Sequence, residues 1–274
     1  MRSLDTLANE VGSLDERLVT LEAHEAIATV TLNSPANFNA LSSAMIAALQ
    51  STFDQLADRA DVRVVILAAQ GRAFCAGHDL REMRSQDAKA WHEALFMRCS
   101  NLMRTMDALP QPVIARVQGI ATAAGCQLVA TCDLAIASED ATFATSGINL
   151  GLFCSTPAVA LTRVIGQKSA AEMLFTGEFI DARRAASLGL INREVPAESL
   201  VQETQHLAAR IAAQSGDALR SGKALLRKLR RSVALEADYE MSAMNMACDM
   251  QTRDAKAGID AFLMKKARPD WEHC

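Results

Sequence analysis

The chain has 274 residues, 50% of them hydrophobic, and a formal net charge of −4 at pH 7. This size and hydrophobic content predict one main domain with a large core. Basic residues are scattered, which argues against nucleic-acid binding, and the cluster at 227–231 is typical of a solvated helix face. The seven cysteines form no Cys-x-x-Cys pair and have no His at zinc spacing. Free, buried thiols in a reducing compartment are therefore expected, and no metal site is predicted.

Residues 1–22 carry several carboxylates and no apolar run, a pattern untypical of a secretory signal or a transit peptide. No stretch reaches membrane-spanning length, so no membrane partner is expected. These observations lead us to expect a cytoplasmic protein.

Hydrophobic periodicity predicts the following elements in the first part of the chain. They are a hairpin, a helix, a strand, a long helix and three further strands, at residues 18–32, 42–60, 62–69, 80–108, 113–117, 134–137 and 141–144. After Pro157 the pattern becomes helical, over residues 158–164, 169–175, 182–188 and most of 196–266, with one strand at 190–195. We expect an extension at 1–17, a β-rich core at 18–195 and a helical region at 196–274.

Two glycine-bearing turns each follow a predicted strand and precede a predicted helix. They run from Arg72 to Leu80 and from Gln118 to Leu128. Their small residues let a backbone approach a ligand, and each helix start leaves several N–H groups without intrahelical partners. Two such donors aimed at one oxygen would form an oxyanion hole. The repeated order also predicts a β-β-α winding.

With both turns identified, the chain resembles the enoyl-CoA hydratase/isomerase (crotonase) superfamily from about Leu18 to its carboxyl end. The markers occur in order, at residues 33–35 with 39–41, 73–80, 124–128, 132–135, 175–177 and 182–190. Residues 76–80, 123–130 and 151–157 resemble the branch of enoyl-CoA hydratase domain-containing proteins. This resemblance implies an α/β crotonase (ClpP-like) fold, a spiral of β-β-α units with a C-terminal helical trimerisation region. It also implies homotrimers or homohexamers, a lyase of fatty acid metabolism, and no cofactor apart from the CoA of the substrate.

The resemblance also implies where an acyl-CoA or enoyl-CoA thioester binds. Its carbonyl oxygen would lie between the backbone N–H groups of His78 and Ala124. Lys265 and Lys266 would reach the CoA phosphates of a neighbouring subunit, or else form an ordinary exposed helix end. The remaining substrate-binding positions implied are Ala36, Phe38, Ala76, Gly77, Asp79, Leu80, Gly125 and Phe153.

Both carboxylates that hydratases of this superfamily use for proton transfer are missing. Their positions match Gln127, which can orient water but not take a proton, and Gly147, which has no side chain. Each missing acid–base group typically costs about 10²- to 10⁴-fold in rate, so efficient hydration is not expected. Relatives that place an Asp slightly further on match Cys154 or Ser155, and neither is a carboxylate.

Several residues allow two interpretations. The His78 imidazole is either a proton carrier facing the ligand or a side chain turned outward or bonded to Asp79. Asp79 is expected to cap its helix, Glu82 to be a solvated carboxylate, and Cys154 to be a buried, inert thiol rather than a nucleophile.

Three functions stay open on the sequence. The first is an acyl-CoA-binding, enoyl-CoA hydratase-like enzyme. The second is a thioesterase, isomerase or decarboxylase that uses the same oxyanion stabilisation. The third is a catalytically silent acyl-CoA sensor or scaffold.

Overall fold

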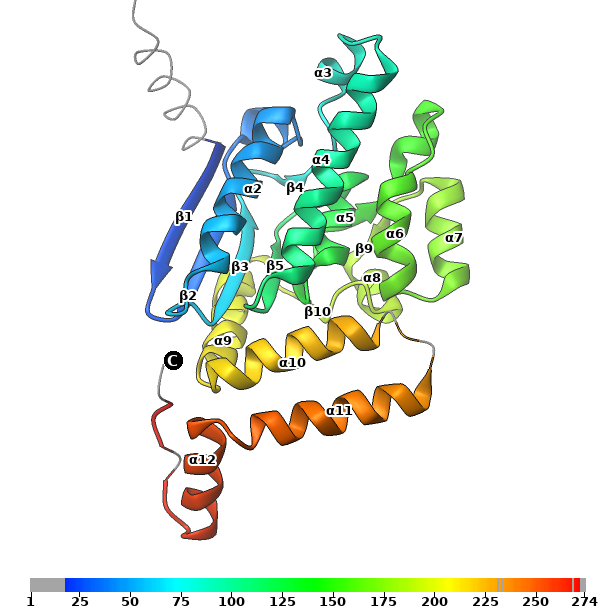
Figure 1. Ribbon diagram of the computed structural model, residues 1–274. Coiled ribbons are helices and arrows are strands. Elements are labelled where there is room, and N and C mark those ends of the chain that lie inside the picture. Colours follow the sequence, from blue (N-terminus) through cyan, green and yellow to red (C-terminus); the bar gives the residue numbers. More distant parts are fainter. Residues whose placement is uncertain (1–17, 231, 233, 268, 272–274) are drawn as a thin grey trace, which may run out of the picture.

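The computed structural model describes residues 18–230, 232, 234–267 and 269–271 (Figure 1). The expected extension at 1–17 lies outside these residues. Two sheets form the centre of the molecule. The six-stranded sheet has the order β1-β2-β3-β5-β7-β10, with β1 antiparallel to β2 and the remaining neighbours parallel. These strands are β1 (Val19–His24), β2 (Ile27–Leu32), β3 (Val64–Ala69), β5 (Val113–Val117), β7 (Leu134–Ser138) and β10 (Arg193–Val195).

The smaller sheet has the order β4-β6-β8-β9, parallel except for β9. Its strands are β4 (Ala73–Cys75), β6 (Ile120–Thr122), β8 (Thr142–Ala144) and β9 (Ile180–Asp181). The chain passes twice from the large sheet to the small one and then into a helix. These passages are β3-β4-α3, with α3 at Leu80–Arg84, and β5-β6-α5, with α5 at Ala124–Thr131. The expected β-β-α winding is therefore confirmed.

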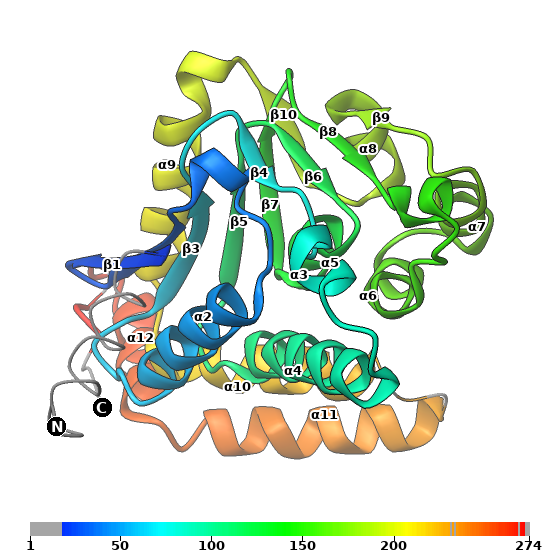
Figure 2. The same cartoon turned by 90° about the horizontal axis from the view of Figure 1, so that it is seen from above.

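Alternation along the central strands places side chains in two separate cores. Val65 and Leu67 of β3 face the larger core, whereas Val64 and Ile66 face a smaller cluster that includes Ala208. Ala208 belongs to α9 (Leu200–Ala212), which covers that face of the sheet. Helices α2 (Ser43–Ala57) and α4 (Lys89–Ala108) pack together away from α9 (Figure 2).

The expectation of one helix over 80–108 is wrong, because residues 85–88 separate α3 from α4. Ser85 ends α3: its backbone N–H and its hydroxyl both bond to carbonyls of that helix, the hydroxyl donating to the Glu82 carbonyl at 2.7 Å. Ala88 then has extended dihedrals, φ −77° and ψ 119°, before α4 begins. Apolar periodicity spans this break and therefore does not reveal it.

The later part of the chain is mainly helical, as expected. Its helices are α6 (Ser155–Val164), α7 (Gln167–Thr176), α8 (Ala182–Leu188), α9, α10 (Gly216–Leu229), α11 (Leu235–Asp249) and α12 (Arg253–Leu263). Short 3₁₀ turns occur at Pro35–Asn37, Ser146–Leu150 and Ala197–Ser199. Figure 1 shows α10 beneath the core, α11 beneath α10, and α12 at the end of the molecule away from α3.

A buried ion pair fastens α10 to the core. Lys223 is only 6% exposed, and its Nζ lies 2.6 Å from Oδ2 of Asp133. The same ammonium donates to the carbonyls of Met106 and Gln111, and Asp133 accepts the Val113 N–H. Burial lowers the pKa of Lys223, while the nearby Asp133 carboxylate acts in the opposite direction. Each charge is thus compensated by a specific partner.

Within the described part of the chain, Cys75, Cys99, Cys126, Cys132 and Cys154 are free and buried, and Cys248 is free and exposed. Burial raises the pKa of the Cys126 thiol to about 12. Across these same residues, no helix is long and apolar enough to cross a bilayer, and no group of His, Cys, Asp or Glu could hold a metal ion.

Candidate functional site

The two glycine-bearing turns lie against each other. β4 and β6 pair in parallel, with Cys75 opposite Ala121, so the turns that follow them start side by side. Gly77 has a positive φ of +88°, and a Cβ added there would lie 2.9 Å from the Ala123 Cβ. A Cβ added to Gly125 would lie 2.1 Å from the Cys75 carbonyl oxygen. Glycine is therefore required at both positions for this close approach.

The first turn is also hydrogen-bonded to residues 36–41, the segment before α2. The Leu41 N–H donates to the Gly77 carbonyl at 2.7 Å, and the Asp79 N–H donates to the Leu41 carbonyl at 3.4 Å. Because backbone groups alternate in direction along an extended segment, the His78 N–H faces the side opposite Leu41. The second turn lies near: a Cβ added to Gly77 would be 3.3 Å from the Ala124 nitrogen.

Neither of these two N–H groups has a hydrogen-bond acceptor among the described residues. Ala124 is the first residue of α5, a position whose N–H has no intrahelical partner. The preceding residue, Ala123, has φ 50° and ψ −119°, which is unusual for a residue with a Cβ. Such strained residues often occur at functional sites, and this one turns the chain from β6 into α5.

The sequence left open that the His78 imidazole is turned outward or bonded to Asp79, and the structure shows neither orientation. It is not turned outward, and its Nδ1 lies 3.3 Å from the Leu41 carbonyl oxygen rather than at Asp79. The ring meets Phe96 edge to face at 5.3 Å between centroids. Burial lowers the pKa of His78, so the neutral imidazole dominates at pH 7. If Nδ1–H donates to Leu41, then Nε2 carries a free lone pair.

Two orphaned polar atoms mark the site. His78 Nε2 and Gln127 Oε1 are both buried and have no hydrogen-bond partner among the described residues. Gln127 is only 4% exposed and lies one turn after Ala124 on α5. Buried polar groups are almost always paired, so atoms left unpaired indicate a position that water or a ligand fills.

Gly147 has no side chain, and the structure leaves no room for one at this position. A Cβ there would lie 2.6 Å from the Leu152 carbonyl oxygen and 2.8 Å from the Cys154 Sγ. The Leu152 N–H also donates to the Gly147 carbonyl at 3.0 Å, which closes this loop. In this conformation a glutamate cannot occupy position 147.

Residues 153–155 offer little chemistry. Burial raises the pKa of the Cys154 thiol, which disfavours a thiolate. The Ser155 hydroxyl is exposed and contacts the Phe153 carbonyl at 3.4 Å. The Phe153 ring is partly exposed and contacts Phe175, with 5.9 Å between centroids.

The segment before α2 lies over the first turn. The Ala76 N–H donates to the Phe38 carbonyl at 3.0 Å, and the Phe38 ring contacts the Arg72 guanidinium at 4.5 Å from the ring centroid. Ala36 lies in the 3₁₀ turn just before. The conformation of this segment has no sequence signal that we recognised, yet its Leu41 carbonyl is what orients the His78 ring.

Asp79 and Glu82 both act at helix starts. The Asp79 carboxylate accepts the N–H groups of Arg81 and Glu82, which confirms its role as the cap of α3. Leu80, the first residue of α3, is exposed. Glu82 was expected to be solvated and is instead partly buried, because its carboxylate accepts the Ser43 N–H at 2.8 Å.

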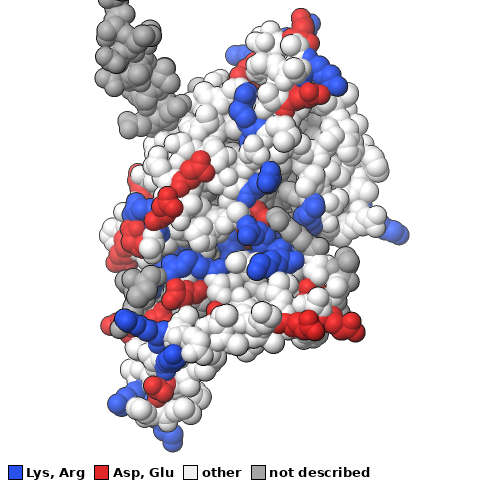
Figure 3. All heavy atoms as spheres, in the orientation of Figure 1, with Lys and Arg blue, Asp and Glu red and all other residues white. Residues whose placement is uncertain are grey.

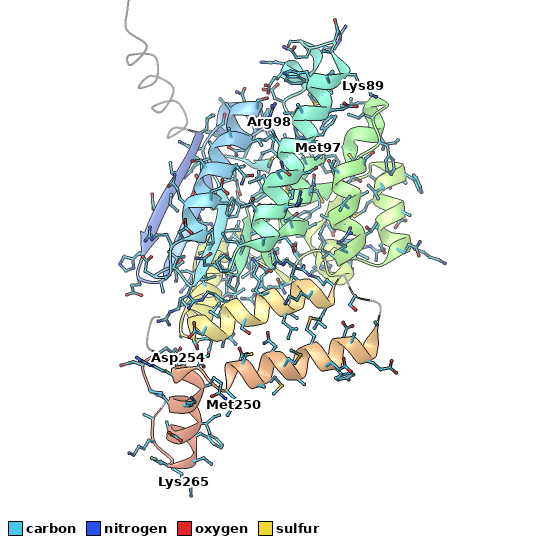
Figure 4. The ribbon with its side chains drawn as sticks, viewed as in Figure 1. Lys89, Met97, Arg98, Met250, Asp254 and Lys265 are labelled. Atoms are coloured by element: carbon cyan, nitrogen blue, oxygen red, sulfur yellow. The ribbon has the colours of Figure 1, made fainter. Side chains whose placement is uncertain are left out.

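Lys265 and Lys266 follow α12. Figure 4 shows Lys265 at the tip of that helix, at the end of the molecule opposite Lys89 and α3. Within one chain these lysines therefore lie far from the two turns. Their expected contact with CoA stays a prediction that involves a neighbouring copy.

Comparison with known proteins supplies the family. The profile of the enoyl-CoA hydratase/isomerase family matches residues 22–273. The chain is 43% identical over 249 residues to human enoyl-CoA hydratase domain-containing protein 3, mitochondrial, covering 91% of this chain and 82% of the relative. The rat protein of the same name is 42% identical over 259 residues, which cover 94% and 86% of the two chains.

Solved structures agree with this match. An enoyl-CoA hydratase from Mycobacterium smegmatis superposes with a TM-score of 0.90 at 51% identity, covering 93% of this chain and 98% of that one. The human domain-containing protein 3 gives a TM-score of 0.89 at 42% identity, covering 92% and 100%. The expected crotonase fold is therefore confirmed.

One expectation is contradicted. The rat and human relatives are mitochondrial by name, which argues against the cytoplasmic location inferred from composition. The lack of a leader-like pattern in residues 1–22 was a poor guide, because composition does not specify a compartment.

The family match over nearly the whole chain and the shared fold lead to one conclusion: the chain belongs to the enoyl-CoA hydratase/isomerase family.

Proposed function

We propose that this chain binds an acyl-CoA thioester and stabilises negative charge on its carbonyl oxygen. The oxygen would accept hydrogen bonds from the backbone N–H groups of His78 and Ala124. The observation that carries this proposal is that neither N–H group has an acceptor among the described residues and that both belong to turns lying against each other. One preorganised donor of this kind is worth about 3 to 4 kcal/mol of transition-state stabilisation.

Efficient hydration of an enoyl thioester is not part of the proposal. Water addition needs groups that deprotonate water and protonate the α-carbon, and each is worth about 10²- to 10⁴-fold. Gln127 can hold water or substrate through its amide but cannot accept a proton at neutral pH. The space at Gly147 is closed by Leu152 and Cys154.

His78 is the group that we propose as proton carrier. Its Nε2 is buried and has no partner within the described part of the chain, and its Nδ1 lies 3.3 Å from the Leu41 carbonyl oxygen. A reaction with one proton carrier and an enolate intermediate, such as double-bond isomerisation, fits these groups better than hydration does. Thioester hydrolysis and decarboxylation use the same oxyanion stabilisation and are separated from isomerisation by their products.

A second copy of this chain is the partner that we propose. Residues 235–264, which form α11, α12 and the positions directly after each, expose large apolar side chains, which single-chain proteins seldom leave in contact with water. They are Tyr239, Met244, Met246, Met250, Ile259, Phe262, Leu263 and Met264. A trimer or hexamer would cover this surface and bring Lys265 near a neighbouring site. Sedimentation of the protein and of Phe262→Glu tests this, because a monomeric wild-type protein would contradict it.

Calorimetric titration with butyryl-CoA and with free CoA tests the main proposal. Tighter binding of the thioester is expected, since only the thioester offers an oxygen to the two N–H groups. No binding of either compound would overturn it. Incubation with a 3-enoyl-CoA then separates two reactions: a shifted double bond indicates isomerisation, released thiol indicates hydrolysis, and no product excludes both.

A further inference from the structure

A second feature of the molecule is a cavity of about 470 Å³ between α4, α5, α6 and α10. This volume is within the usual range for small-molecule sites. Part of its wall is apolar, formed by Met103, Ala130, Val159 and Val164. Its other wall carries Arg104, Arg163, Arg227 and Arg230, and we call it the arginine cavity.

The arginine cavity has a strong excess of positive charge, although the whole chain is negative. Its lining includes four arginines and a single carboxylate, Asp107, which forms an ion pair with Arg230 at 2.9 Å. Figure 3 shows Lys and Arg gathered on this face, where the lower end of α4 meets α10.

The other arginines lack carboxylate partners among the described residues. Arg104 contacts the neutral Asn101 Oδ1 at 3.4 Å, and Arg163 donates to the Val159 carbonyl at 2.6 Å. Arg227 forms no ion pair with any carboxylate that the structure describes. Neighbouring cations without counter-charges repel one another, so an anion between them is favoured.

Gln127 is the residue that the lining of the arginine cavity shares with the proposed thioester site. This residue belongs to the cavity wall, is 4% exposed and has an unpaired Oε1. Positions 127, 130 and 131 share one face of α5, since residues three and four apart lie side by side on a helix. An acyl chain whose carbonyl lies at the Ala124 N–H and which follows this face would pass Gln127 before it reached the cavity. From Ala124 to Thr131 it spans about 10 Å.

We propose that the arginine cavity binds the far end of the acyl group, and that this end carries a carboxylate. The preferred substrates would then be ω-carboxyacyl-CoA thioesters of medium length. The methylene chain would lie on the apolar wall, and the terminal carboxylate would accept hydrogen bonds from Arg104 and Arg227. This inference rests on the proposed function, because it places the thioester carbonyl at His78 and Ala124.

Matched pairs of ligands test the inference. Octanoyl-CoA and suberyl-CoA have the same chain length and differ in the terminal carboxylate, as do decanoyl-CoA and sebacyl-CoA. Calorimetry is expected to give at least one ω-carboxy ligand a dissociation constant about 10- to 100-fold lower than its partner, the range for a charge-assisted hydrogen bond.

Two variants and a control complete the test. Arg104→Met and Arg227→Met should abolish the advantage of the ω-carboxy ligand and leave octanoyl-CoA binding unchanged. Arg98→Met is the control: Arg98 is also on α4 (Figure 4), but its guanidinium donates to the Ser43 hydroxyl at 3.2 Å on the side of α2. This variant should keep the advantage. Thermal melting confirms that each variant is folded.

Three results would overturn the inference. Equal affinity within both ligand pairs would show that the carboxylate is not recognised. Variants that weaken octanoyl-CoA, suberyl-CoA and free CoA equally would place the CoA phosphates, not the acyl end, at the arginines. Free suberate bound as tightly as suberyl-CoA would indicate an anion site independent of the thioester. Failure of every thioester to bind would instead contradict the proposed function.

Discussion

Gly77 and Ala124, 47 positions apart in the sequence, are in direct contact, since a Cβ added to Gly77 would lie 3.3 Å from the Ala124 nitrogen. This contact brings two helix starts together and makes a shared site for one oxygen physically possible.

The close approach of the turns predicts the effect of Gly125→Ala. Its Cβ would lie 2.1 Å from the Cys75 carbonyl oxygen, so α5 must move away from β4. We expect a loss of about 3 kcal/mol in the free energy of unfolding, the upper range for overpacking. Urea unfolding measures it.

Gly222→Ala is the matched control, because a Cβ there meets nothing within 4 Å and the position lies inside α10. It should stabilise the protein by about 0.5 to 1 kcal/mol through helix propensity. A neutral Gly125→Ala would contradict the packing described here.

Restored carboxylates should differ in effect. Gln127→Glu keeps the shape of the side chain and should raise crotonyl-CoA hydration by about 10²-fold, the lower range for one acid–base group. Gly147→Glu should bring no gain and should lower the melting temperature, because its Cβ would overlap Leu152 and Cys154. The rate of hydration is measured by the loss of enoyl absorbance. Fast hydration by the unaltered protein would contradict the loss of both acid–base groups at positions 127 and 147.

His78 should make stability depend on pH. Burial lowers its folded pKa below the ordinary value of 6.5, so the unfolded chain binds this proton first as pH falls. Stability should therefore be complete above pH 6.5 and decrease as pH falls through the folded pKa. His78→Gln should flatten this slope, measured by urea unfolding at several pH values.

The exposed His24 provides the control for this measurement, and His24→Gln should keep the slope of the unaltered protein. His78→Gln should also slow turnover more than it weakens thioester binding, if the imidazole carries protons. An equal loss in turnover and in thioester binding would indicate that the imidazole has a purely structural role.

The buried pair of Lys223 and Asp133 should stabilise the attachment of α10. Lys223→Met leaves Asp133 without its cation and should cost about 3 kcal/mol in the free energy of unfolding, as for other broken buried pairs. A double-mutant cycle with Asp133→Asn isolates the coupling. Lys89→Gln, which breaks the exposed pair with Glu93, should have little effect. Similar results for the two pairs would contradict the role given to burial.

Much of the fold could be predicted because its signals are local. The small residues of both turns, the capping Asp79 and the strand-like run predicted at 62–69 each determine structure within a few positions. β4 and β6 are three residues long, too short for periodicity to separate them from a turn. The break between α3 and α4 depends on the local bonds of Ser85, which an apolar pattern does not register.

The site was only partly predictable, for a different reason. His78, Ala124 and Gln127 could be singled out from spacing and resemblance, but their surroundings depend on residues far away in the sequence. The Leu41 carbonyl that orients the imidazole and the backbone that closes the space at Gly147 carry no sequence signal. The arginine cavity likewise combines side chains from four helices.

The near-ultraviolet spectrum of bound acetoacetyl-CoA tests most directly whether the His78 and Ala124 N–H groups stabilise a thioester oxyanion. The enolate of this thioester absorbs where the neutral form does not, so the spectrum reports stabilisation of the oxyanion without any turnover. The comparison uses Ala123→Gly and the double variant Ala123→Gly/Ala124→Pro. Proline replaces the Ala124 N–H with a ring methylene and is tolerated at the first position of a helix, while glycine at 123 relieves the strain before it.

A stronger enolate band is expected on binding to the protein and to Ala123→Gly. In the double variant the enolate equilibrium should fall by about 10²- to 10³-fold, the effect of one lost donor. Binding with an unchanged spectrum, or an enolate band that survives the loss of the Ala124 N–H, would contradict this expectation.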